Sequence, residues 1–439
     1  MTLKLPHPLV LLMGAVALAA ASTWVLPAGE FSRRENAATG RIVVVPGTYE
    51  TVDAAPVGLF DLFVAVPRGF IEGADVIAVI LFVGGAWVVV DRTGTLARMI
   101  ASLVAVFRRR GLWAIPVFSF VFGTMGALEN MQEEIIPLVP VLLVLGRGLG
   151  VNAVVVVAMS AGAAMVGSAF GPTNPFQAGI AMKLAQLPPL SMFGLRSAMF
   201  VAGLSLWSAW TMRYAARTRL AMSDADATGE RAGTKDVVIM LCALAPMVAY
   251  VYGALALDWG FNELSAGFVI AGIVVGLAGG LGVTGTINAY FEGMQTLLPA
   301  AIIVGMARSI SLVMADGRVI DTILNAMAAP LSHMSGASAL LLMIPFHALL
   351  HIPVSSVSGQ AVLTMPIMVP LADLLGLSRD AAVIAYQTGA GLMELLTPTN
   401  GALMALLLAA KVPFGQWFRF AIAAAGLMLL VGIIGVLVA

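Results

Sequence analysis

Two short polar stretches interrupt long apolar segments of this chain. The first, GPTN, occupies residues 171–174, and the second, TPTN, occupies residues 397–400. A proline inside a helix removes a backbone donor and disrupts the preceding turn, which frees carbonyl groups to coordinate an ion or a solute. The half-helix that follows directs its amide donors at the break, which suits a carboxylate. Neutral donors and acceptors come from four side chains: Thr173, Asn174, Thr399 and Asn400.

A second kind of interruption carries charge. Residues 129–134 read ENMQEE and residues 355–360 read SSVSGQ, each between apolar arms. Carboxylates at bilayer depth are costly and indicate a functional site by default, unless the segment reaches the headgroups and is solvated. They could coordinate a cation, carry a proton or hold a substrate ammonium group. The candidates are Glu129, Asn130, Gln132 and Glu133 in the first stretch, with Glu134 ranked behind them, and Ser355, Ser356, Ser358 and Gln360 in the second.

An arginine and a further glutamate lie in other apolar segments. Arg308 is near the middle of AAIIVGMARSISLVMAD. An unpaired charge there would cost about 2.5–3.5 kcal/mol on insertion scales. Arg308 therefore needs a partner, either a substrate carboxylate or an internal acid such as Glu394, three residues before TPTN. Substrate contact and simple pairing remain open for both residues.

Other patterns carry less weight. His347 and His351 have the i, i+4 spacing of metal ligands, but no third ligand is evident, which favours a polar helix face. A G-x-G-x-x-G match at 280–285 follows an apolar span rather than a strand, so it does not indicate a dinucleotide site. We expect no metal and no cofactor. A coupling proton or sodium ion is possible, with Asn174, Asn400 and Glu133 as its candidate ligands.

The elements that must position these residues are membrane-spanning helices. Of the 439 residues, 60% are hydrophobic and 10% are charged, whereas soluble domains carry about a quarter charged residues. The 23 basic and 23 acidic residues balance, which indicates no nucleic-acid partner. A helix needs about 20 apolar residues to cross a bilayer. We expect nine spans, near 8–26, 72–91, 150–185, 192–212, 236–256, 264–284, 294–314, 378–410 and 417–438.

The loops predict the orientation of these spans. The segments 92–111 and 213–235 are rich in arginine and are expected in the cytoplasm. The segment 27–70 balances its arginines with acids and is expected outside as a loop, with a small hairpin in GRIVVVPGTYETVD. The first span could be a cleaved signal peptide, but its length favours a retained helix. We therefore expect a cytoplasmic N-terminus.

The chain also contains a weak internal repeat. A shift of 226 residues places GPTN on TPTN and ENMQEE on SSVSGQ without a gap. The first copy follows a basic loop and the second does not, which predicts that the repeats are inverted. Paired broken helices in inverted repeats are typical of secondary transporters. The predicted units are 1–71, an N-terminal helix and external loop; 72–212, with a re-entrant hairpin at 113–147 and a broken helix at 150–185; 213–293, a cytoplasmic loop and scaffold helices; and 294–439, with a hairpin at 336–375 and a broken helix at 378–410.

Several longer motifs resemble a known family. They include VVVPGTYETVDAAPVGLFDLF, ENMQEE, GPTNPFQAGIA, GMARSISLVMADG, PVSSVSGQAVLTMPIMVPLADLLG and LLTPTNGALMALL, in order along nearly the whole chain. They resemble the YfcC-like proteins of the C4-dicarboxylate anaerobic carrier-like group, within the ion transporter superfamily. HALLHIPVSS and GAGLMELLTPTN depart from the expected pattern, so His347, His351 and Glu394 could alter substrate specificity.

The resemblance implies secondary transport by an all-α polytopic protein of the bacterial inner membrane. It also implies a scaffold domain and a transport domain, usually in a homodimer with an elevator mechanism. Members are labelled as dicarboxylate carriers or as basic amino acid antiporters. Three glutamates against one arginine favour a basic amino acid over a C4-dicarboxylate, and a proton- or sodium-coupled organic anion carrier is a further alternative. A channel would not need inverted hairpins. An enzyme would need a nucleophile or metal motif, and neither G-x-S-x-G nor H-E-x-x-H occurs.

Overall fold

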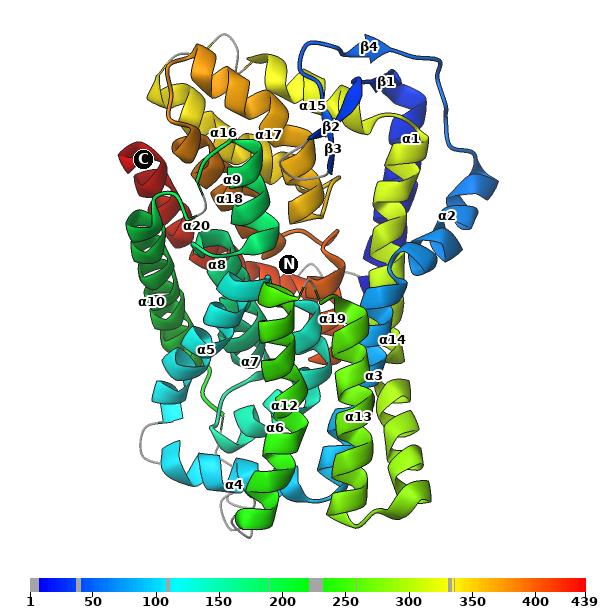
Figure 1. Ribbon diagram of the computed structural model, residues 1–439, viewed down its shortest axis with the longest axis vertical. Helices are drawn as coiled ribbons and strands as arrows, with labels where there is room; N and C mark the ends of the chain where they lie inside the picture. The colour runs from blue at the N-terminus through cyan, green and yellow to red at the C-terminus, as the bar shows by residue number, and fades with distance from the viewer. Residues whose placement is uncertain are drawn as a thin grey trace.

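Helices form most of the computed structural model (Figure 1). It describes residues 8–36, 41–107, 111–188, 190–220, 232–257, 259–330, 334 and 336–439. Within these ranges, seven helices are long and apolar enough to cross a membrane: Ala74–Arg92, Gly111–Leu128, Ala153–Phe170, Phe261–Gly279, Gly282–Asp316, Val357–Leu374 and Phe414–Val438. The prediction of a polytopic helical membrane protein is confirmed, although two small two-stranded sheets also form.

The N-terminal part combines two helices with the two sheets. Its elements are α1 (Pro8–Val25), β1 (Gly29–Glu30), β2 (Arg33–Asn36), β3 (Arg41–Val44), β4 (Glu50–Thr51) and α2 (Leu59–Glu72). Strand β1 pairs antiparallel with β4, and β2 pairs antiparallel with β3. The expected hairpin therefore forms from β2 and β3. Only β3 lies within the predicted segment 40–53, because β2 precedes it. Helix α2 lies where the sequence predicts a loop, because its 14 residues are too few for a span.

The central part contains the first broken helix. Its elements are α3 (Ala74–Arg92), α4 (Thr95–Phe107), the 3-10 turn Gly111–Trp113, α5 (Ala114–Glu129), the 3-10 turn η2 (Glu133–Leu138), α6 (Val139–Gly148), α7 (Ala153–Val157), the π-helical turn Ala158–Gly162, α8 (Ala163–Phe170), the π-helical turn Pro175–Gly179, α9 (Ile180–Leu184) and α10 (Phe193–Arg217). The interruption falls at 171–174, where the sequence predicts it.

The C-terminal part contains the second broken helix. Its elements are α12 (Thr234–Ala256), α13 (Phe261–Gly279), α14 (Gly282–Asp316), α15 (Ile320–Ala328), α16 (Ala337–Leu350), α17 (Val357–Leu374), α18 (Arg379–Glu394), α19 (Gly401–Ala409) and α20 (Phe414–Val438). The predicted boundaries of spans 264–284 and 294–314 are wrong. Gly280 and Gly282 adopt positive φ angles of 90° and 67°, so the chain turns there and α14 begins twelve residues early.

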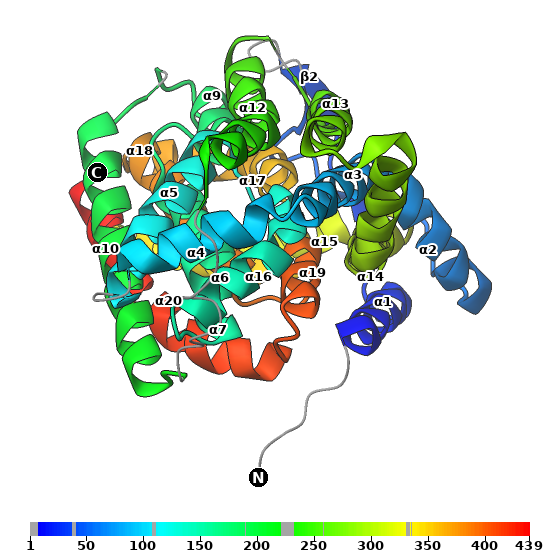
Figure 2. The same ribbon diagram turned by 90° about the horizontal axis from the view of Figure 1, so that it is seen from below.

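The two ends of the molecule differ. In Figure 1, α4 and the N-terminal end of α12 lie at one end, and the sheets and α15 lie at the other. Described parts of the two basic segments, residues 92–107 and 232–235, are thus at the same end, opposite the two sheets. Residues 108–110 and 221–231 lie outside the described residues. Figure 2, turned by 90°, places α10 and α20 on one side of the molecule and α1, α2 and α14 on the other.

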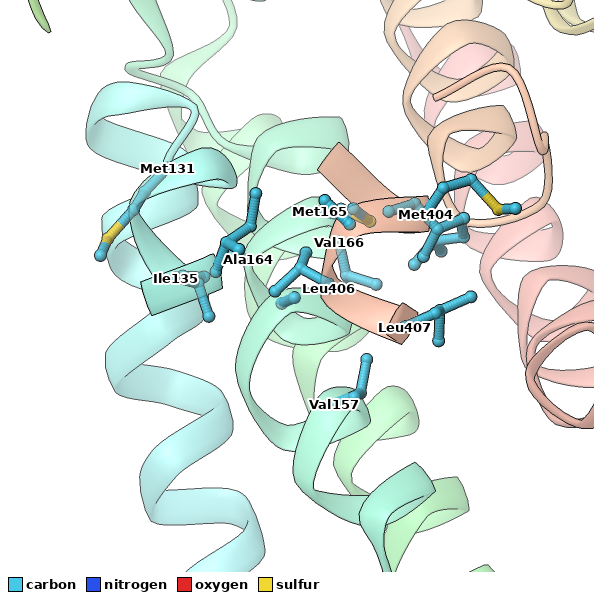
Figure 3. Close-up of a cluster of buried hydrophobic side chains, with 14 of the residues drawn as sticks. Met131, Ile135, Val157, Ala164, Met165, Val166, Met404, Leu406 and Leu407 are labelled. Atoms are coloured by element: carbon cyan, nitrogen blue, oxygen red, sulfur yellow. The ribbon is translucent and has the colours of Figure 1, made fainter. Parts of the chain in front are cut away.

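Helices α8 and α18 lie in the interior and are buried along nearly their whole length. Helix α5 packs against α8, and α16 packs against α18. Both contacts are close because glycine removes the side chain: a Cβ on Gly126 would overlap the carbonyl of Ala164, and one on Gly389 would overlap the carbonyl of Ile344. Figure 3 shows that apolar side chains of α8 and α19 share one cluster, so the two broken helices meet in the core.

Candidate functional site

The first break is fastened to the C-terminal end of α5. Asn174 caps the turn that follows the break, because its Oδ1 accepts the amide of Gln177 at 2.9 Å. Its side-chain amide group donates to the carbonyl of Gly126 at 3.2 Å and to Oδ1 of Asn130 at 3.1 Å. Thr173 donates to the carbonyl of Ala127 at 2.8 Å. These hydrogen bonds therefore join the end of α5, the proline break and the start of the next half-helix into one unit.

The second break is built in a similar way. Asn400 caps α19 by accepting the amide of Leu403 at 3.2 Å, and its amide group donates to the carbonyl of Glu394 at 3.2 Å. The hydroxyl groups of Thr397 and Thr399 lie 2.7 Å apart within the break. An asparagine N-cap thus starts each second half-helix, and each amide end faces the interior.

A cavity of about 250 Å³ lies between these breaks and the turns that follow α5 and α16. Nine predicted site residues line it: Asn130, Gln132, Glu133, Arg308, Ser355, Ser356, Ser358, Glu394 and Asn400. The sequence reasoning missed Phe176, Tyr250, Phe261, Val304, Ala307, Ser311, Val357, Gly401 and Ala402, and it ranked Glu134 too low. The sequence could have indicated Phe176, because it lies two residues after the Asn174 cap. No local sequence pattern indicates Tyr250 or Phe261.

Four predicted site residues support the cavity rather than line it. Thr173, Asn174 and Thr399 use their side chains within the breaks. Gln360 is fully buried and bonds to the two histidines of α16. Both polar atoms of the Asn174 side chain are engaged by protein groups, which argues against its role as an ion ligand. Glu129 ends α5, but its side chain lies outside the described part of the structure.

Arg308 does not pair with Glu394, contrary to one of the two predicted alternatives. Within the described ranges, Arg308 has no ion pair and no side-chain hydrogen bond, although it lines the cavity together with Glu133, Glu134 and Glu394. Glu394 instead accepts a hydrogen bond from Gln132. Glu133 interacts electrostatically with Arg308 without forming an ion pair, so the guanidinium group keeps its hydrogen-bond donors for a solute that enters the cavity.

Glu394 joins the cavity to a buried polar chain. Its Oε1 lies 3.7 Å from Nε2 of His351. Nδ1 of His351 lies 2.8 Å from Oε1 of Gln360, whose Nε2 donates to the carbonyl of His347 at 2.8 Å. The histidine pair that the sequence assigned to a polar helix face thus connects directly to the candidate site. Among the described residues, no group of three or more His, Cys, Asp or Glu side chains could hold a metal ion.

Spanning helices around a charged cavity define a membrane transport protein. The chain belongs to the C4-dicarboxylate anaerobic carrier family, whose model matches residues 5–439. It is therefore a multi-pass membrane protein and a secondary transporter. The resemblance noted in the sequence is confirmed.

Two curated relatives match over nearly their whole length. The chain is 29% identical to an Escherichia coli (strain K12) protein named "Putative basic amino acid antiporter YfcC", over 97% of this chain and 94% of that protein. It is 27% identical to an uncharacterized protein of Haemophilus influenzae, over 98% of this chain and 96% of the other.

Two solved structures are more distant. The YdaH transporter of Alcanivorax borkumensis matches with a TM-score of 0.45 and 18% identity, over 98% of both chains. MtrF of Neisseria gonorrhoeae, from a class of antimetabolite efflux pumps, matches with a TM-score of 0.44 and 17% identity, over 99% of this chain and 95% of MtrF. At this distance they add nothing to the family assignment.

Proposed function

We propose that the chain transports a small amino acid, with a basic amino acid as the favoured substrate, by antiport. One observation carries this proposal: Arg308 faces the cavity without an ion partner among the described residues, and three carboxyl groups face the same cavity. The carboxylate of an amino acid fits the guanidinium group, and a bidentate bond is the geometry that arginine favours. The cationic groups of a basic amino acid fit the carboxyl groups.

The remaining lining groups would complete the binding of the solute. Asn130, Ser355, Ser356, Ser358 and Asn400 offer neutral donors and acceptors. The N-terminus of α19, capped by Asn400, directs its free amides toward the same region and favours an anion there. Glu133 lines the same cavity and would bind the cationic group of the solute. Glu129, whose side chain is not described, belongs to the same proposal on the sequence alone.

We also propose that two inverted repeats form an elevator-type architecture. Helices α5 and α6 lie toward one end of the molecule, and α16 and α17 lie toward the other, which supports an inversion (Figure 1). The contact of α5 with α8 and that of α16 with α18 are equivalent under the 226-residue shift, which supports the repeat units 72–212 and 294–439. In this proposal, the hairpins and broken helices move together against α3, α13 and α14. A homodimer in the bacterial inner membrane with a cytoplasmic N-terminus completes the arrangement.

A C4-dicarboxylate is the second candidate substrate, because the family takes its description from C4-dicarboxylate carriers. A dicarboxylate would place its second carboxylate near Glu133 or Glu394, where like charges repel unless a cation or a proton intervenes. A coupled sodium ion or proton would supply that charge. The same requirement applies to a coupled organic anion.

Counterflow in proteoliposomes distinguishes these substrates. Purified protein is reconstituted, and uptake of labelled arginine, ornithine, succinate and fumarate is measured with and without each unlabelled solute inside. We expect saturable uptake of arginine and ornithine that internal arginine stimulates. Stimulation by succinate alone would favour the dicarboxylate, and conductance without counterflow would indicate a channel. Normal arginine transport by both Glu129→Gln and Glu133→Gln would refute the acidic site.

A further inference from the structure

The buried pair of His351 and Glu394 lies at the inner wall of the cavity. His351 is fully buried and Glu394 is 5% exposed. Nε2 of His351 has no hydrogen-bond partner among the described residues, and it lies 3.7 Å from Oε1 of Glu394. An unpartnered polar atom at this depth is costly, so its retention calls for a ligand.

The hydrogen bonds around Gln360 determine which nitrogen of His351 carries a hydrogen. Nε2 of Gln360 donates to the carbonyl of His347, so Oε1 of Gln360 must accept. It accepts from Nδ1 of His351 at 2.8 Å, which assigns the ring hydrogen to Nδ1. Nε2 of His351 then presents a lone pair to Glu394.

The carboxyl group of Glu394 is oriented from its other side. Its Oε2 accepts a hydrogen bond from Nε2 of Gln132. The orientation of the Gln132 amide is fixed in turn by Asn400, whose Nδ2 lies 3.5 Å from Oε1 of Gln132. Two acceptors, Nε2 of His351 and Oε1 of Glu394, therefore face each other with room for one hydrogen between them.

We propose that this pair is the binding site for a coupling proton. One proton from the cavity binds between Nε2 of His351 and Oε1 of Glu394, and the net charge of the pair rises from −1 to 0. Release of that proton restores the carboxylate, which can then attract a cationic group of the solute in the cavity. Proton and cationic solute compete for the same negative charge, which is the requirement for antiport. The inference rests on the proposed function and names its coupling ion.

The charged and titratable groups around the pair support this assignment. They are His347 from α16, Tyr386 from α18, Glu133 and Glu134 from η2, and Arg308 from α14, with Asp75 of α3 acting on Glu133 from farther away. Helix α17 contributes the neutral Gln360. Tyr386 is committed to the carbonyl of Val357 at 2.5 Å. Among these carboxyl groups, Glu394 is thus the one that faces the lone pair on Nε2 of His351.

A spectroscopic experiment tests the site without a substrate. Full-length protein labelled with 15N-histidine is examined in lipid by solid-state NMR, and its four histidines give a simple spectrum. The signals of His351 are assigned by their loss in His351→Gln, or in His351→Asn if the first variant does not fold. We expect the Nδ1–H tautomer at high pH and a doubly protonated ring, or a strong shift of Nε2, on acidification between about pH 8 and pH 5. An Nε2–H tautomer that does not change over this range would overturn the proposal.

A transport experiment tests the coupling. In proteoliposomes, an interior more acidic by one pH unit should accelerate arginine uptake toward about a tenfold accumulation, because one proton leaves for each solute that enters. His351→Gln should lose this stimulation, and the control Arg419→Gln, at an exposed position of α20 that does not line the cavity, should keep the wild-type ratio of gradient-driven uptake to counterflow. A wild-type protein with strong counterflow but no response to the pH gradient would overturn the proton site. Absence of counterflow for every solute would instead refute the proposed function.

Discussion

At the scale of single residues, Arg308 differs from arginines on the surface of the molecule. Arg68 and Arg92 are roughly half exposed, yet each contacts an acid, Asp316 at 2.5 Å and Glu292 at 2.6 Å. Exposed pairs of this kind contribute little. Arg308 lies in a more costly position and has no such contact within the described ranges. The cost is reasonable if a solute carboxylate supplies the missing partner.

The first prediction concerns this guanidinium group. Arg308→Gln should weaken binding of both arginine and succinate about 10- to 100-fold, because a hydrogen bond to a charged group contributes about 1.5–3 kcal/mol. Equilibrium binding of the labelled solutes to purified protein measures the change. Arg419→Gln removes the same charge from an exposed site whose Nε bonds to the carbonyl of Gly415, and it should bind as wild type does. Equal affinity of wild type and Arg308→Gln would show that the arginine has another role.

The same scale shows what sequence could and could not predict about the site. Polar residues in apolar runs are visible in a sequence, and this signal found Asn130, Gln132 and Glu133. Partner choice is not visible, because it depends on which turns of different helices meet. Glu394 therefore bonds to Gln132 and lies beside His351, where the sequence offered Arg308 as an alternative.

At the scale of elements, the asparagine caps determine where each second half-helix begins. Asn400→Ala removes the cap of α19 and should destabilise the protein by about 1 kcal/mol. It should also slow arginine counterflow, since the amide that orients Gln132 is lost. Thermal unfolding in detergent and counterflow measure the two effects.

Asn152→Ala is the matched control for this prediction. Asn152 caps α7 by accepting the amide of Val155 at 3.1 Å, and it does not line the cavity. The control should lose a similar amount of stability and keep its transport rate per folded molecule. If both variants slowed transport equally, the effect would be one of stability alone.

A further prediction at this scale concerns the contact of α5 with α8. Gly126→Ala places a Cβ against the carbonyl of Ala164, where only backbone movement can relieve the overlap. We expect a loss of about 1–3 kcal/mol, as is typical of overpacking. Gly426→Ala in α20 meets no atom within 4 Å and should be neutral or gain up to about 1 kcal/mol from helix propensity. Unfolding temperatures of the two variants in detergent decide the matter, and an unchanged Gly126→Ala would mean that α5 and α8 are not in close contact.

Sequence predicted long elements better than short ones. Apolar runs located α3, α10, α12 and α20, because a bilayer requires such runs. Helices α2 and α4 lie in segments that the sequence assigned to loops. Each is too short for a span, and α2 buries one face, at Leu62, Ala65 and Gly69, so its signal is periodicity rather than length.

At the scale of the whole molecule, the central question is which elements move together. The two broken helices share a core, and the second one contacts α14, through α19, less extensively than α3 does. This pattern supports a moving unit made of hairpins and broken helices, and a static unit that contains α3 and α14. The family resemblance implies a scaffold domain and a transport domain, but apolar runs alone do not assign each helix to one of the two.

Cross-linking tests this division. A Cβ on Gly401 of α19 would lie 2.9 Å from that of Ala307 of α14, close enough for a disulfide after a small backbone shift. With Cys242 replaced by Ser, oxidation of the double variant Gly401→Cys, Ala307→Cys should abolish counterflow, because the bond would tie the moving unit to the static one. A reductant should restore the rate of the reduced variant. Gly391→Cys with Ala169→Cys, whose Cβ atoms would lie 2.6 Å apart within the moving unit, should also cross-link but keep its counterflow. If both cross-links blocked transport, the broken helices would have to move relative to each other. If neither cross-link blocked transport, α19 and α14 would have to move together.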